Sequence, residues 1–212
     1  MSAVCEACSP ESSARPLKLL QQVTDPIGSF EESDSVFFKE LVSGFPITAS
    51  LVSDAAGNTI SATGSSAGLG NATDLSLLIA LRRQAQVILT SGSTFRADKY
   101  RFPKQADLAV LTTKPVEIDA PNGQRLLVKS SGYGEALLEL RAEGYSRIHV
   151  EYGVSGISAL VAAGSLDALL LSSPASSGVR ALADRLAVKP MILELTDLCI
   201  GLVAWQPRMV RA

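Results

Sequence analysis

Short polar segments stand directly after apolar runs in this chain, and they hold the residues best suited to chemistry. The clearest is Ser91-Gly92-Ser93-Thr94, which follows the β-branched and apolar run Gln86–Thr90. Residues this small let backbone amides approach a ligand, and ligands bind at the carboxyl ends of strands in open α/β sheets. An ordinary strand-to-helix loop would have the same composition, so spacing alone leaves both interpretations open.

Side chains for metal binding or nucleophilic catalysis are scarce. His149 is the single histidine and lies in Arg147–Glu151, a buried-looking strand, so we expect a satisfied core histidine rather than a catalytic base. Cys5 and Cys8 have the C-x-x-C spacing of zinc or redox sites, but no second pair completes four zinc ligands. Two incidental thiols explain them better, and Cys199, in an apolar run, is expected in the core. We therefore expect no metal site.

The segment Asp74–Tyr100 is expected to form a helix, a buried strand and a polar turn. Three apolar residues at spacings of three and four share one face of this helix: Leu75, Leu78 and Ile79. Thr73 or Asp74 can accept hydrogen bonds from the first free backbone N–H groups and so start the helix.

The remaining elements alternate between strands and helices, which predicts a mostly parallel sheet with right-handed crossovers. Strands are expected at Pro46–Ser53, Asp107–Thr112, Arg125–Val128, Arg147–Glu151 and Leu166–Leu171, helices at Glu31–Val42, Gly134–Ala142 and Ser158–Ala163, and a helix or loop at Val179–Leu186. Met191–Leu195 and Cys199–Trp205 predict a terminal antiparallel hairpin. The long Gly- and Ser-rich segment Asp54–Gly70 is either a functional loop or a flexible surface loop.

Composition limits the class of protein. The 212 residues are 47% hydrophobic, enough for the core of one domain over residues 17–212, preceded by a disordered tail at 1–16. A net charge of −2 argues against a nucleic-acid surface. No run of about 18 apolar residues indicates a membrane helix, and the N-terminus does not resemble a signal peptide. We expect a cytoplasmic protein. Neither G-x-G-x-x-G nor the P-loop motif occurs.

Several motifs, in order and spacing, resemble the reductase domain of riboflavin biosynthesis, the pyrimidine reductase group within the dihydrofolate-reductase-like fold. That group carries a strand ending S-x-D-G, a Gly- and Ser-rich loop, a helix containing L-R, and a strand followed by a turn of the T-S-x-x-T-V-x-A-D type. Here the corresponding segments are SLVSDAAGNT (50–59), GSSAGLGNATD (64–74), LR (81–82) and ILTSGSTFRAD (88–98). The later strand end V-E-G-G-P and L-x-D-E correspond to VEYGV (150–154) and LDA (166–168).

The resemblance implies an α/β fold of the dihydrofolate-reductase-like class and an NADPH-dependent reductase. Its substrate would be a phosphorylated pyrimidine or pterin-like small molecule, and the protein would be a homodimer. The resemblance places the cofactor against Ser91, Gly92, Ser93, Thr94, Gly153, Val154 and Ser155, with Thr112, Thr113 and Lys114 near the adenosine 2′-phosphate. It implies catalytic roles for Glu151 and Asp54, and substrate contacts from Ser50, Arg82 and Arg96. The sequence equally allows Lys114 to be a solvated loop lysine and Glu151 to be paired with a nearby Lys or Arg.

Two departures from the pattern bear on function. The Asp-Gly of the group aligns with Ala56-Gly57, which removes an acid, and Asp54 could replace it only if the loop is rebuilt. The Gly-Gly pair becomes Tyr152-Gly153, and we expect the tyrosine ring to crowd the cofactor. Two classes of function therefore remain: an active reductase, and a non-catalytic binding or scaffold protein that retains the fold. No deaminase motif, H-x-E with P-C-x-x-C, accompanies either.

Overall fold

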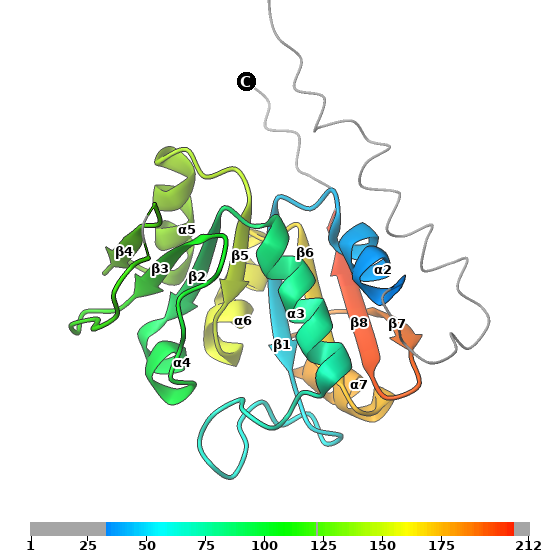
Figure 1. Ribbon diagram of the computed structural model, residues 1–212. Coiled ribbons are helices and arrows are strands. Elements are labelled where there is room, and N and C mark those ends of the chain that lie inside the picture. Colours follow the sequence, from blue (N-terminus) through cyan, green and yellow to red (C-terminus); the bar gives the residue numbers. More distant parts are fainter. Residues whose placement is uncertain (1–32, 122, 206–212) are drawn as a thin grey trace, which may run out of the picture.

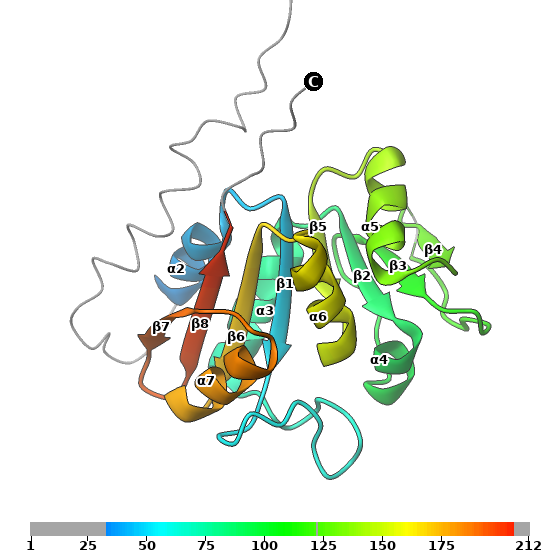
Figure 2. The ribbon, with the colours of Figure 1, turned by 180° about the vertical axis from the view of Figure 1, so that it is seen from behind.

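One eight-stranded sheet with helices on both faces forms the protein (Figures 1 and 2). The computed structural model describes residues 33–121 and 123–205. The expected tail at 1–16, with Cys5 and Cys8, lies outside these described residues. The strands are β1 (Ile47–Val52), β2 (Val87–Ser91), β3 (Asp107–Leu111), β4 (Leu126–Lys129), β5 (Ile148–Glu151), β6 (Ala168–Ser173), β7 (Met191–Glu194) and β8 (Cys199–Ala204).

The sheet has the strand order β4-β3-β2-β5-β1-β6-β8-β7. The first six strands are parallel to one another, and β8 runs antiparallel to both β6 and β7. The prediction of a mostly parallel sheet with a terminal antiparallel hairpin is therefore confirmed, with each expected strand placed to within two residues. Because the first six strands are parallel, their carboxyl ends meet at one edge of the sheet, where a ligand site is expected.

The helices divide between the two faces of the sheet. They are α2 (Ser33–Val42), α3 (Ala72–Gln84), α4 (Gly92–Ala97), α5 (Tyr133–Ala142), α6 (Val154–Ala163) and α7 (Ser176–Arg185). Figures 1 and 2 show α2 and α3 on one face, and α5, α6 and α7 on the other. The short helix α4 follows directly from the end of β2.

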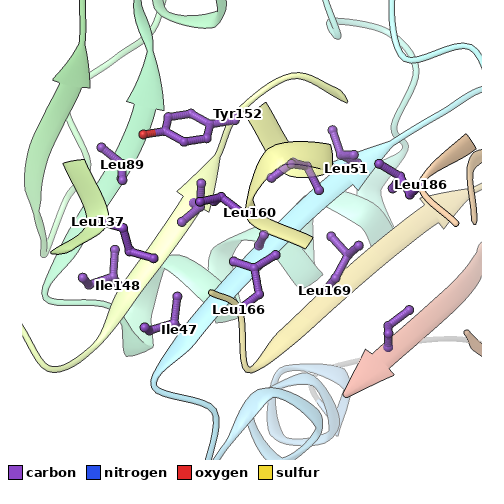
Figure 3. Packing of buried hydrophobic residues seen from close by; sticks show 14 of the residues in the cluster. Ile47, Leu51, Leu89, Leu137, Ile148, Tyr152, Leu160, Leu166, Leu169 and Leu186 are labelled. Atoms are coloured by element: carbon purple, nitrogen blue, oxygen red, sulfur yellow. The ribbon is translucent and has the colours of Figure 1, made fainter. Parts of the chain in front are cut away.

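The larger part of the core lies between the sheet and α5, α6 and α7 (Figure 3). Alternation along β5 directs Ile148 and Val150 into this layer, where they meet Leu137 and Leu160 from the helices. Each such fully buried side chain contributes about 1.5–3 kcal/mol. Cys199 lies in the same core with 7% of its surface exposed, as expected.

Helix α3 packs against the sheet through a different face from the one that the sequence spacing predicted. Leu75 is 54% exposed and Ile79 is 39% exposed, whereas Leu77 and Leu81 are almost fully buried. Apolar residues occur on every side of this helix, so spacing did not define one stripe. The cap is Asn71, whose side chain accepts a hydrogen bond from the backbone amide of Asp74, three residues along, so the expected cap at Thr73 or Asp74 is wrong.

The start of α6 differs from expectation, and the sides of β8 are both buried. Helix α6 begins at Val154 rather than at Ser158, because Gly153 lies in extended conformation and provides the cap. The apolar residues of β8 are buried in the core, Val203 on the side of the sheet covered by α7 and Ile200 on the side covered by α2. Among the described residues, no helix is long and apolar enough to cross a membrane.

Candidate functional site

A groove of about 480 Å³ lies at the carboxyl ends of β1, β2, β5 and β6. This volume is within the range of small-molecule sites, and the position is the one at which open α/β sheets bind ligands. The long segment between β1 and α3 supplies one wall with Thr59, Ile60, Ser65 and Ser66. Asp98 holds this segment in place, because its carboxylate accepts hydrogen bonds from the backbone amide and the hydroxyl of Ser66 at 2.9 and 3.0 Å.

The groove brings together eight of the residues that the sequence placed in the site. They are Ser50, Ser91, Ser93, Thr94, Glu151, Gly153, Val154 and Ser155. Seven others do not line it: Asp54, Arg82, Gly92, Arg96, Thr112, Thr113 and Lys114. The eight residues that line it come from the ends of three strands far apart in sequence, β1, β2 and β5, so the sheet itself assembles the site.

The turn after β2 forms one side of the groove. Ser91 ends the strand, and its hydroxyl accepts a hydrogen bond from the Thr94 amide at 3.2 Å and contacts the Ser93 and Thr94 hydroxyls at 2.9 and 3.0 Å. The expected polar turn is thus a capped first turn of α4. Thr94 and the exposed Ser93 reach the groove, and the Ser91 hydroxyl orders the turn behind them.

The loop after β3 lies behind this turn rather than in the groove. A Cβ on Gly92 would stand 2.6 Å from Thr112, so glycine is what allows the two segments to meet. The Thr112 amide is bonded to the β4 side at Lys129 O (2.7 Å), and its hydroxyl accepts from the Lys114 amide (3.1 Å). The Arg96 guanidinium reaches the same place, 3.0 Å from the added Cβ. Arg96 therefore lies with the β3 loop, not on the groove wall where a substrate contact was expected.

The turn between β5 and α6 forms the opposite side of the groove. Gly153 caps α6 without any side-chain hydrogen bond, so the first amides of this ten-residue helix face the groove end unblocked by a side chain. A Cβ added to Gly153 would meet nothing within 4 Å. Backbone N–H groups at such a helix start favour a negatively charged ligand group.

Tyr152 lines the groove, but its ring is turned largely into the core and does not fill the groove as the sequence led us to expect. It is 2% exposed and lies beside Leu89 and Leu160 beneath the α5–α6 layer (Figure 3). Tyr133 covers it at 5.0 Å between ring centroids. Room for the ring comes from Gly156, where a Cβ would stand 2.7–2.9 Å from the Tyr152 side chain. The tyrosine at the first glycine position is therefore matched by a glycine one turn along α6.

Glu151 is the partner of Arg82. Its two carboxylate oxygens accept from the guanidinium Nε and Nη2, each at 2.7 Å, and Oε2 also accepts from the Tyr100 hydroxyl at 2.7 Å. Burial would raise the pKa of Glu151, but the hydrogen bonds and charge of Arg82 outweigh it and the pKa is lowered. Glu151 is thus an ionised, fully occupied carboxylate at the groove floor, the paired arrangement that the sequence had left open.

Asp54 is directed away from the groove. Its carboxylate accepts hydrogen bonds from the Ala56 and Asn58 amides at 2.9 and 2.8 Å and from the Asn58 side chain at 2.8 Å. These bonds lower the pKa of Asp54, the Asn58 side chain being the largest cause. Asp54 closes a local turn of the long loop and does not replace the missing acid in the groove.

One groove carboxylate has no charged partner among the described residues, and the sequence assigned it only to helix capping. Asp74 lines the groove at the start of α3 and accepts a hydrogen bond from the Ser172 hydroxyl at 2.5 Å. Burial raises the pKa of Asp74, against the lowering effect of that hydrogen bond. No cation pairs with it among the residues described. Asn71 already supplies the helix cap, and Asp74 stands two residues inside the helix. That position was the sequence signal that Asp74 was free for a role other than capping.

The protein shares its fold with solved pyrimidine reductase-like and riboflavin biosynthesis proteins. Comparison with solved structures supports this assignment and gives it detail. A pyrimidine reductase-like protein from Corynebacterium diphtheriae is similar with a TM-score of 0.55 and 17% identity, over 88% of this chain and 98% of that one. A riboflavin biosynthesis protein from a Shewanella species gives 0.54 and 11%, over 75% and 98%. RibD of Acinetobacter baumannii gives 0.55 and 14%, over 79% of this chain and 60% of that one.

These likenesses confirm the expected dihydrofolate-reductase-like fold and the resemblance to the pyrimidine reductase group. At these identities they establish the fold, and the activity needs its own evidence. No protein-family model matches the sequence. No curated protein matches it either.

Proposed function

We propose that this protein is an NADPH-dependent reductase acting on a pyrimidine- or pterin-type substrate. A relative of the 5-amino-6-(5-phosphoribosylamino)uracil reductase kind would fit the fold. The observation that supports the proposal best is the groove, whose two sides are the turn after β2 and the start of α6. The fold and the groove agree, because the same strand ends that resemble the reductase motifs line this one cavity.

The cofactor half of the groove needs backbone donors and small residues, and the chain has both there. Thr94 and Ser93 present hydroxyls on one side, and Gly153, Val154 and Ser155 present the start of α6 on the other. The open space at the Gly153 Cβ position leaves room for a phosphate to reach the helix amides. When bound, NADPH supplies the hydride, and the residues of the groove contribute by holding the two reactants in register.

Lys114 and Arg96 are the cations we assign to the adenosine 2′-phosphate. The Arg96 guanidinium and Thr112 meet beside Gly92, and the Lys114 amide is bonded to the Thr112 hydroxyl. Neither cation makes an ion pair with a residue that the structure describes. A free cation beside a cofactor turn is suited to a dianionic phosphate.

The substrate half would be the end around Ser50, Asp74 and Ser172. A carboxylate without a charged partner accepts hydrogen bonds from ring N–H groups, which pyrimidines and pterins carry, and burial raises the pKa of this one. Leu77 and Leu81 supply apolar surface at the same end. The homodimer implied by the resemblance stays a prediction.

One observation favours the second candidate, a non-catalytic binding protein. Glu151 is consumed by Arg82 and Tyr100, so the acid that the resemblance made catalytic has no free oxygen for a substrate proton. A protein of this second class would bind NADPH or a pyrimidine without transferring hydride. Binding and turnover must therefore be measured separately.

Titration with NADPH, followed by the fluorescence of the reduced nicotinamide, tests the proposal. We expect saturable binding of NADPH that is weakened in Thr94→Ala and in Lys114→Ala. With NADH, which lacks the 2′-phosphate, the affinities of Lys114→Ala and wild type should differ less. Lys104→Ala is the matched control, because Lys104 precedes β3 at the opposite edge of the sheet and is also exposed. Absence of binding at millimolar NADPH would eliminate the reductase. Binding without oxidation of NADPH by any pyrimidine or pterin carbonyl compound would favour the second class.

A further inference from the structure

A layer of buried polar side chains lies between α3 and the sheet, at the inner end of the groove. Alternation along β5 places His149 and Glu151 on this face, opposite Ile148 and Val150 in the main core. Thr48 and Ser50 of the neighbouring strand β1 occupy the same layer. Ser50 and Glu151 line the groove, while His149 behind them has no exposed surface.

His149 is held at both ring nitrogens. Nδ1 lies 2.9 Å from the Thr48 hydroxyl and Nε2 lies 3.2 Å from the Ser50 hydroxyl. The nearest charge is the Glu151 carboxylate, whose Oε1 is 3.7 Å from Nε2 and is already bonded to Arg82. The ring thus connects the buried Thr48 hydroxyl on one side with the groove-lining Ser50 hydroxyl on the other.

We propose that His149 is a positioning residue that, as the Nε2–H tautomer, fixes the Ser50 hydroxyl as a hydrogen-bond donor into the groove. A bare Nε2 lone pair would face the Glu151 carboxylate, whereas an Nε2–H is attracted by it. Nδ1 then accepts from the Thr48 hydroxyl, and Nε2–H donates to Ser50 Oγ. The Ser50 hydroxyl proton has no acceptor among the described residues, so it is directed to a ligand.

A fixed donor at this point selects for a ring that carries a carbonyl oxygen, such as a pyrimidinone or pterinone. The choice of ligand class rests on the proposed function, but the state of His149 does not. In the opposite tautomer, Nδ1–H would donate toward Thr48 and Nε2 would accept from Ser50. The groove would then present an acceptor and would select for a ring amine.

The ring stays neutral over the working pH range. Burial lowers the pKa of His149 to about 4, and the charge of Arg82 lowers it further, whereas the charge of Glu151 and a hydrogen bond to the Thr48 backbone raise it. The Thr48 backbone contact is the one that favours a proton on Nδ1, so the proton position must be measured. The other titratable group at this cluster, Tyr100, is bonded to Glu151 and Arg82, and burial raises its pKa. A neutral ring with one proton is what a fixed hydrogen-bond relay requires.

The test uses the fact that the chain has one histidine, so that ¹⁵N-histidine labelling gives a single imidazole spectrum. In the ligand-free full chain we expect a one-bond ¹H–¹⁵N signal at Nε2, an unprotonated Nδ1, and no titration between pH 5 and 8. A proton on Nδ1, or a doubly protonated ring at pH 7, would overturn the proposal. This readout involves no ligand, so it cannot fail merely because the reductase assignment fails.

A double-mutant cycle then tests the action through Ser50, with 5,6-diaminouracil as the probe. We expect Ser50→Ala and His149→Asn each to weaken binding several-fold, and the double variant to be no weaker than Ser50→Ala alone. His149→Gln, whose amide can reach toward Ser50, should restore part of the affinity. Additive losses in folded variants, checked by circular dichroism, would overturn the positioning role. If wild type does not bind the probe, the proposed substrate class fails while the tautomer result still stands.

Discussion

The two sides of the groove differ from its floor in which polar groups are free to bind a ligand. The sides, at Ser91–Thr94 and Gly153–Ser155, retain small residues and backbone donors. The floor holds a carboxylate that is already paired, because Glu151 is bonded to Arg82, and Asp54, outside the groove, is bonded into its own loop. The sides therefore offer backbone donors to a ligand, whereas the two acids that the resemblance made catalytic are occupied within the protein. Each prediction below tests one part of that contrast.

The largest effect is expected from Arg82→Ala. Glu151 is only 11% exposed, so removal of its partner leaves a buried, uncompensated charge and should cost about 3–5 kcal/mol of unfolding free energy. Arg125→Ala is the control, because the Arg125 side chain is 61% exposed beside Asp107 and should cost below about 1 kcal/mol. Urea unfolding at pH 7 measures both.

The pH dependence of the Arg82→Ala effect has a defined sign. The pKa of Glu151 is lowered in the folded protein, so the ion pair contributes fully above the unfolded pKa of about 4.3 and is lost as the pH falls through the folded value. Wild type and variant should therefore converge in acid. A constant difference down to pH 3 would show that Arg82 acts by packing.

The second effect concerns Gly156→Ala. The added Cβ would stand 2.7–2.9 Å from Cβ, Cγ and Cδ2 of Tyr152, which cannot move aside without repacking the core, so we expect a loss of about 1–3 kcal/mol. Gly134→Ala in α5 meets nothing within 4 Å and should leave stability equal or slightly higher. If Gly156→Ala is as stable as wild type, the tyrosine ring does not pack under α6, and it would be free to block the groove.

The smallest effect on stability is expected from Asp74→Asn. Burial raises the pKa of Asp74, so the folded state holds the proton more tightly and stability falls as the pH rises from about 4 through the folded pKa. The amide lacks this fall, so the variant should be slightly more stable at pH 7 and equal to wild type in acid. The same variant should bind 5,6-diaminouracil more weakly.

Asp54→Asn makes the same change of charge outside the groove and serves as the control for that binding loss. Thermal melts across pH, together with ligand titrations, separate the two aspartates. A larger binding loss in Asp54→Asn than in Asp74→Asn would reverse the assignment of the groove acid.

The strands were predictable because β-branched and apolar runs ended by Gly, Pro or polar residues define them locally. The mostly parallel sheet followed from the alternation of strands and helices, and the reductase-like fold followed from the order of the motifs, but the order of the strands in the sheet was not predicted. The rotation of α3 was not predictable, because apolar residues surround it and only contacts such as Thr73 to Asp197 fix which side faces the sheet. The partner of Glu151 was equally hidden, since Arg82 is 69 residues away and meets it only after the sheet forms.

The groove acid and the placement of Tyr152 show the same limit. Asp74 has the sequence of a helix start, and only the loop between β1 and α3 turns it toward the strand ends. Tyr152 conflicts with the reductase pattern until Gly156 is considered, and that pairing depends on packing across one helical turn. Local sequence therefore predicted which backbone would form the groove, but not which charges would remain free in it.

The most direct test of the central claim is an NADPH titration of wild type beside Gly153→Ala. The claim is that the start of α6 and the turn after β2 hold the cofactor. A methyl group at Gly153 enters open space in the protein, so stability should change by less than about 1 kcal/mol, while the methyl group occupies the place proposed for the phosphate. We predict saturable binding to wild type and at least a tenfold loss in the variant, about 1.4 kcal/mol. Equal affinity in the two proteins, or no binding to wild type at millimolar NADPH, would contradict the account.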